Sequence, residues 1–180
     1  ADKWIKYSTL NKVSKPNIIS VWKPVGVTSY DVIREIKKNN NNFKKVGHCG
    51  TLDPFAEGVL IVCVDDEVKN AKQYVSLPKT YVADIVFGSE TDTLDSTGDI
   101  FKINKNKDRI RKSDIAHVLS KFQDGYIQSP PYFSAKKING VRIYNLARKK
   151  IFIRLKGSHV NIYNLEILSY SNMKLRLLVE

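Results

Sequence analysis

Residues 47–64, GHCGTLDPFAEGVLIVCV, join a loop of small and turn-forming residues to a run of apolar residues. The apolar run, 58–64, is continuous and rich in valine and isoleucine, which favours a strand buried on both faces. The loop before it contains Asp53, followed directly by proline. Asp before Pro is a common turn signal, so this carboxylate either caps the turn or has a chemical task.

The segments before this loop predict a strand, a turn and a helix. Residues 17–22, NIISVW, are β-rich and are closed by KPVG, which is typical of a strand ending in a turn. The segment 28–38, TSYDVIREIKK, begins with cap-type residues and has the spacing of an amphipathic helix. We expect Val32, Ile33 and Ile36 on its buried face.

The segments after the loop continue the mixture of helix and strand. Residues 65–77 have an acidic start and Val68, Ala71 and Val75 at helical spacing, which predicts one helix. Residues 80–88, TYVADIVFG, alternate as a sheet strand does. The acidic segment 89–99 lacks the spacing of a calcium loop and is interpreted as a solvated loop.

The rest of the chain predicts one further helix and several strands. We expect Ser113 to cap a helix with a buried apolar face, made of Ile115, Val118, Leu119 and Phe122. The Asn139-Gly140 dipeptide is typical of a two-residue hairpin turn. Hairpins mixed with helices, without an internal repeat, indicate an α+β fold: a mixed, largely antiparallel β-sheet flanked by helices.

Composition points to a polyanionic partner. Thirty Lys and Arg against 18 Asp and Glu give a formal charge of +12 over 180 residues, which attracts nucleic acid, RNA first. A lysine-rich proteome would also give this balance. Cys49 and Cys63 do not form a metal-binding motif with the scattered histidines, so we expect reduced thiols and no metal.

The chain shows no sign of a membrane segment. Its first 20 residues lack the apolar core of a signal peptide, and no run approaches the ~18 apolar residues of a membrane span. We therefore expect a cytoplasmic protein. An initial Ala leaves room for a removed targeting segment, in which case the compartment is an organellar matrix.

Asp53 has three possible chemical uses besides capping a turn. A glycosidase-like pair requires a second acid, for which Glu57 is the nearest candidate. A metal site requires further hard ligands, and Thr51 with Glu57 makes a poor set. A carboxylate nucleophile requires no second acid, because it forms a covalent intermediate by itself. The local sequence leaves these alternatives open.

Four sequence blocks, which follow one another along the chain, narrow the choice among the possible roles of Asp53. They are KPVGVTSYDV from residue 23, GHCGTLDPFAEGVLIV from 47, KTYVADIVFGSETDTLDSTGD from 79 and PPYFSAKKINGVRIYNLAR from 130. Together they resemble the TruB/Cbf5 group of pseudouridine synthases, most closely its bacterial TruB type. The resemblance implies the pseudouridine synthase fold and the isomerisation of a uridine in the TΨC arm of tRNA. It implies an aspartate nucleophile at Asp53, attacking C1′ of the ribose or C6 of a flipped-out base, without metal or organic cofactor.

The resemblance also assigns substrate-binding roles. His48 matches a histidine that contacts RNA near the space left by the flipped base, and Tyr81 matches a tyrosine that stacks on that base. Lys23 matches the lysine of a Lys-Pro block that supports the catalytic loop. Without the resemblance, the three would be a loop histidine, a core tyrosine and a turn lysine. A basic set around the predicted hairpin suits phosphate contacts: Lys136, Lys137, Arg142 and Arg148.

Two departures from the family pattern qualify these expectations. Cys49 stands where the family usually has Thr, a change between small residues. A family block of the Gly-Thr-Tyr-Ile-Arg type, whose arginine pairs with the aspartate, has no match, and Arg176 lies in a different sequence setting. We therefore expect an N-terminal extension, 1–17, and a catalytic domain, 18–180, that lacks its C-terminal part and the C-terminal RNA-binding domain.

The expected partner is tRNA through its TΨC stem-loop, bound by a monomer that needs no obligate protein partner and no membrane. The alternative to an enzyme is a non-catalytic basic module that binds RNA or assists tRNA folding.

Overall fold

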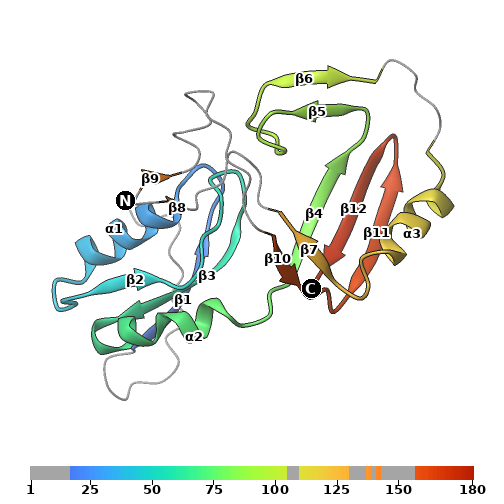
Figure 1. The fold of residues 1–180 in the computed structure, drawn as a ribbon. Helices are drawn as coiled ribbons and strands as arrows, with labels where there is room; N and C mark the ends of the chain where they lie inside the picture. The colour runs from blue at the N-terminus through green and yellow to red at the C-terminus, as the bar shows by residue number, and fades with distance from the viewer. Residues whose placement is uncertain (1–16, 105–109, 130–136, 139–140, 143–156) are drawn as a thin grey trace. The chain divides into compact units, whose positions relative to one another are not determined.

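The computed structural model describes residues 17–104, 110–129, 137–138, 141–142 and 157–180 (Figure 1). The chain divides into two compact units, one ending at Pro78 and the other beginning at Lys79, and each is described by itself. Within the described residues, every paired strand runs antiparallel to its neighbours. This pattern, together with helices in both units, confirms the predicted α+β class.

The first unit is a three-stranded sheet with one helix packed on it (Figure 1). The strand order is β1-β3-β2, with β1 at Ile18–Lys23, β2 at Val46–His48 and β3 at Gly58–Val64. Helix α1, Ser29–Asn39, buries the side chains predicted for its core face. One cluster holds helix and sheet together: Ile19, Val21, Val32, Ile33, Ile36, Leu60, Val62 and Val64.

Strand β3 is buried on both faces only toward its end. Leu60 and Val62 lie beneath α1, but Val59 on the opposite face is 63% exposed. Its cross-strand neighbour on β1, Trp22, is exposed as well. The prediction of a strand buried on both faces is therefore wrong for the first half of β3, because successive side chains point to opposite faces and α1 covers one of them.

The single helix predicted over 65–77 is also wrong. The structure has a 3₁₀ helix, η1, at Asp65–Asn70 and then a short α2 at Ala71–Val75, and neither buries a residue. The Asp65 carboxylate accepts hydrogen bonds from the backbone N–H groups of Lys44 and Lys45, which ties the start of η1 to a loop. With three residues per turn, η1 does not continue the apolar stripe that helical spacing suggests.

The second unit is built on a sheet of order β11-β12-β4, with β4 at Tyr81–Val86, β11 at Leu165–Ser171 and β12 at Lys174–Val179 (Figure 1). Helix α3, Lys112–Ser120, contributes Ile115 to a small core. Leu175 and Leu177 from β12 complete the buried part of this core. β12 is thus the central strand of this sheet and supplies two of its buried residues.

Two predictions in the second unit need correction. Arg111, and not Ser113, precedes α3, and the Asp114 carboxylate accepts from the Arg111 backbone N–H and guanidinium. Val118 is half exposed, although its spacing predicted burial. Residues 80–88 do form a strand, but β4 has no buried residue, so its alternation did not identify a core face.

The remaining strands form short antiparallel pairs. β5 at Ser89–Thr91 pairs with β6 at Ile100–Ile103, so part of the acidic segment expected to be a loop is a hairpin. β7 at Tyr126–Gln128 pairs with β10 at Ser158–Val160. β8 at Lys137–Ile138 pairs with β9 at Val141–Arg142, as the hairpin prediction requires. The Asn139-Gly140 turn, Lys136 and Arg148 lie outside the described residues.

Candidate active site

Asp53 lies in the loop that connects β2 to β3, and its side chain is exposed. The Ala56 backbone N–H donates to the Asp53 carbonyl over 3.1 Å, which closes a turn immediately after the acid. The carboxylate is therefore accessible from solvent while its main chain is part of a closed turn. This combination suits a group that must react with a molecule arriving from outside.

The backbone on both sides of Asp53 is held by the connection between β1 and α1. The Leu52 N–H donates to the Ser29 hydroxyl oxygen over 3.0 Å, and that hydroxyl donates to the Leu52 carbonyl over 3.1 Å. On the other side, the Gly26 N–H donates to the Pro54 carbonyl over 2.7 Å. The residues before and after Asp53 are thus fixed by the same short segment.

Lys23 lies buried at the end of β1, beneath this segment. Its side chain has 0% exposure, and its ammonium donates to the carbonyls of Pro24 and Val27, each over 2.9 Å. Burial lowers the pKa of Lys23, and the negative charges of Asp53 and Glu57 partly oppose this effect. The lysine therefore shapes the turn through two carbonyls and places positive charge near the candidate nucleophile.

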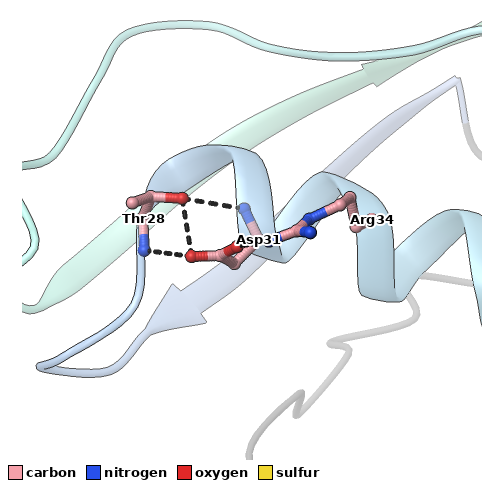
Figure 2. Close-up of polar contacts among 3 residues, drawn as sticks. All are labelled: Thr28, Asp31 and Arg34. Carbon is pink, nitrogen blue, oxygen red and sulfur yellow. Dashed lines mark hydrogen bonds and ion pairs between the residues drawn. The ribbon is translucent and has the colours of Figure 1, made fainter.

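The first turn of α1 is fixed by a capping box (Figure 2). The Thr28 hydroxyl accepts from the Asp31 N–H over 3.1 Å, and the Asp31 carboxylate accepts from the Thr28 N–H over 2.7 Å and from its hydroxyl over 2.6 Å. The Arg34 guanidinium also donates to Asp31. These hydrogen bonds, with Thr28 first and Arg34 next, lower the pKa of Asp31 to about 2.

His48 is the last residue of β2 and directly precedes the loop that contains Asp53. Its Nδ1 donates to the Gly50 carbonyl over 2.5 Å, so this contact orients the imidazole within the loop. Behind it, the buried thiols of Cys49 and Cys63 are free, with their sulfur atoms 2.9 Å apart. Burial, followed by the hydrogen bond with Cys49, raises the pKa of Cys63 to about 12.

The structure brings three of the four predicted site residues into one unit. Lys23, His48 and Asp53 all belong to the β1-β3-β2 sheet or its loops. Tyr81 opens β4 in the second unit, opposite Val179 of β12, and is 47% exposed.

Arg176, the arginine near the end of the chain, is engaged within the second unit. Its guanidinium donates to both carboxylate oxygens of Asp84, over 2.9 and 3.1 Å. Arg176 is therefore paired with a neighbouring strand of its own sheet.

Ser29 and Gly26 are the residues that sequence reasoning missed. The pair TS at 28–29 predicted a helix cap, and KPVG predicted a turn, which is what each forms locally. The contact between Ser29 and Leu52 joins residues 23 positions apart, so no local pattern carries it. A glycine two residues before the cap residue Thr28 was the available hint, because Gly26 adopts a φ of 89° that other residues rarely adopt.

Among the described residues, no group of three or more His, Cys, Asp and Glu side chains is placed to hold a metal ion. In the same part of the chain, no helix has the length and apolar character needed to cross a membrane.

Comparison with known proteins shows the family of the chain. The sequence model of one family, described as TruB family pseudouridylate synthase (N terminal domain), matches residues 37–180, which include the Asp53 loop. The chain belongs to this family. The TruB assignment confirms the resemblance carried by the four sequence blocks.

Relatives and solved structures agree with the TruB assignment. The chain is 42% identical over 151 residues to tRNA pseudouridine synthase B of Clostridium tetani, covering 84% of this chain and 52% of that protein. It is 39% identical over 147 residues to the protein of that name from Aquifex aeolicus, covering 82% and 50%. The chain thus spans about half the length of the curated relatives it matches.

Among solved structures, a Cbf5-Nop10-Gar1 complex matches with a TM-score of 0.59 and 28% identity, over 90% of this chain and 38% of that one. An H/ACA RNP bound to a substrate RNA containing 2′-deoxyuridine matches with a TM-score of 0.58 at 20% identity, over 97% of this chain and 46% of that chain, and shows the fold alone. These matches confirm the predicted pseudouridine synthase fold.

Proposed function

We propose that this chain carries the catalytic centre of an enzyme that isomerises uridine to pseudouridine in the TΨC arm of tRNA. The observation that carries the proposal is the Asp53 loop: an exposed carboxylate whose neighbouring peptide groups are hydrogen-bonded on both sides. Relatives named tRNA pseudouridine synthase B support this choice of reaction and substrate. Residues 18–180 are proposed as the catalytic domain, preceded by an N-terminal extension at 1–17.

The chemistry needs a single nucleophile. The target base must leave its stack before a side chain can reach it, and unstacking costs a few kcal/mol. The Asp53 carboxylate then bonds to C1′ of the ribose or to C6 of the base, and the bond between C1′ and N1 breaks. The uracil turns, a bond forms between C1′ and C5, and the bond between Asp53 and the nucleotide breaks, which restores the free carboxylate. The C5 proton leaves and N1 takes up a proton. No atom is gained or lost overall.

The other predicted residues receive roles around this nucleophile. We assign Lys23 to the support and electrostatics of the loop, because its buried ammonium binds the adjoining turn and attracts Asp53. His48 is assigned to an RNA contact beside the flipped nucleotide, with a ring oriented by Gly50. Tyr81 is assigned to stacking on the target base, and its 47% exposure leaves ring surface for such a contact.

The charge of the chain supports an RNA substrate. A formal charge of +12 favours encounter with the phosphate backbone and makes binding salt-dependent. We propose tRNA as the partner of a monomer that uses no metal and no organic cofactor, since the reaction requires neither a redox step nor a Lewis acid.

The test is release of tritium from C5-labelled uridine in a tRNA transcript by the full-length protein. We expect Asp53→Asn to reduce release on the order of 10⁴-fold or more, because the amide is not a nucleophile. Glu57→Gln is the matched control, since Glu57 is the nearby acid that also attracts Lys23. It should keep most of the activity.

The alternative outcomes separate the remaining hypotheses. Equal loss in both variants would favour a pair of acids over a single nucleophile. Salt-sensitive tRNA binding without release by the unaltered protein would favour a non-catalytic RNA-binding module. Absence of both binding and release would contradict an RNA function.

A further inference from the structure

We propose that Ser29 is a positioning residue for the reaction, whose hydroxyl orients the peptide group that joins Leu52 to Asp53. The inference rests on the proposed function, because it concerns the placement of the proposed nucleophile. Ser29 lies on α1, 23 positions before Leu52 in the sequence, and is 2% exposed.

The Ser29 hydroxyl makes two bonds to the same residue. A hydroxyl has one proton to donate and lone pairs to accept with. Here the proton goes to the Leu52 carbonyl at 3.1 Å, and a lone pair receives the Leu52 N–H at 3.0 Å. The Leu52 carbonyl belongs to the peptide group that continues into Asp53. Fixing both ends of Leu52 therefore fixes the direction in which Asp53 leaves the loop.

Helix capping does not account for this serine. Serine near the start of a helix most often caps it. In α1 the cap is Thr28, whose hydroxyl and N–H bind Asp31, as Figure 2 shows. The Ser29 hydroxyl is thus not needed for the helix, and both of its bonds serve the Asp53 loop.

Ser29 is itself well anchored. It follows the capping box directly, and the next turn of α1 places Val32 and Ile33 in the core shared with β1 and β3. The first turn of α1 is therefore anchored on the core of the first unit, and the Ser29 hydroxyl connects this turn to Leu52.

Placement matters because the Asp53 side chain is exposed. A nucleophile reacts from a separation of about 3 to 3.5 Å with aligned orbitals, and a displacement of about 1 Å can slow a reaction about 100-fold. An exposed carboxylate is enclosed by few side chains, so the placement of its backbone matters more for this alignment.

The test compares single-turnover tritium release with tRNA binding in variants of the full-length protein. Ser29→Ala should slow release about 30- to 100-fold, with a tRNA dissociation constant within about twofold of the unaltered protein. Ser29→Thr keeps the hydroxyl and should restore the rate to within about threefold. Ser29→Cys, with a weakly hydrogen-bonding thiol, should be intermediate, and it serves as the second variant if Ser29→Ala is poorly folded.

The matched control is Ile36→Val, which removes a methyl group from the core face of the same helix, away from Leu52. It should lower the unfolding midpoint without slowing release. An unchanged rate in Ser29→Ala and Ser29→Cys would overturn the inference, and so would equal slowing in Ile36→Val. In both cases release by the unaltered protein and its loss in Asp53→Asn would leave the proposed function intact. Absence of release by the unaltered protein would overturn both.

Discussion

Strands β1 and β4 show how differently the two units use similar sequences. Both are six-residue antiparallel strands rich in apolar side chains. Every second residue of β1 is buried, ending with Lys23, whereas β4 has no buried residue. The difference follows from the covering element, because α1 packs over β1. Apolar alternation thus identifies a strand, and the helix that covers it decides which face becomes core.

The charged residues of the two strands differ in the same way. Lys23 of β1 lies in the core with its ammonium bound to two carbonyls. Asp84 of β4 pairs with Arg176 and Lys174 on the surface of its sheet. Surface pairs contribute little to stability, whereas a buried polar group depends on each of its partners. The units should therefore respond unequally to the loss of a lysine.

The largest expected effect is that of Lys23→Met, compared with Lys174→Met. The first change leaves the Pro24 and Val27 carbonyls without their donor, which should destabilise the protein by about 3 kcal/mol and reduce tritium release. The second removes one exposed partner of Asp84 and should leave stability and activity unchanged. Urea unfolding monitored by circular dichroism gives the comparison, and equal effects would contradict the difference between the units.

A second pair of substitutions separates strain from function. Gly26 and Gly88 have φ values of 89° and 98°, with open space where a Cβ would be added. Alanine at either position should destabilise by about 1 kcal/mol, because L side chains rarely adopt this conformation. Only Gly26→Ala should also slow tritium release, since Gly26 binds the Pro54 carbonyl. Similar activity in the two variants would show that this bond does not position the loop.

The smallest expected effect is on the pH dependence of stability, and it concerns Asp31 and Asp114 in the first turns of α1 and α3. The folded-state pKa of Asp31 is about 2, below its ordinary value of 3.8, so its stabilisation is present above pH 3.8 and is lost as the pH falls toward 2. Asp31→Asn should flatten the decline of the thermal midpoint in that window. Asp114→Asn should flatten it less, because Asp114 of α3 has Arg111 as its partner but no threonine hydroxyl. A steeper decline in Asp31→Asn would contradict the sign.

The sequence predicted what local spacing determines. The buried face of α1 follows from the separation of Val32, Ile33 and Ile36, and all three lie in the core. The predicted start of α3 was wrong. The Asp114 carboxylate binds Arg111, which is the residue before the helix, so that Ser113 lies within the helix. The split of η1 from α2 depends on contacts between Asp65 and a distant loop, which spacing does not encode.

In the candidate site, too, the local sequence predicted some features, whereas contacts between distant residues determine others. The motif around Asp53 predicted an acid in a loop of turn-forming residues, and the loop is hydrogen-bonded on both sides of that acid. The roles of His48 and Tyr81 stay predictions. The segment that holds the loop, Gly26 to Ser29, was interpreted only as a turn and a cap, because contacts across 23 residues leave no local signature.

The Ser29 hydroxyl and the Gly26 N–H both bind the Asp53 loop at its peptide groups. A hydrogen bond to the main chain of a loop residue does not depend on the side chain of that residue. The loop can therefore change its side chains without moving its acid. A change of side chain at Thr51 or Phe55, both exposed, would therefore leave these hydrogen bonds in place. In protein engineering, the side chains at such positions can be exchanged while the two small supporting residues are kept unchanged.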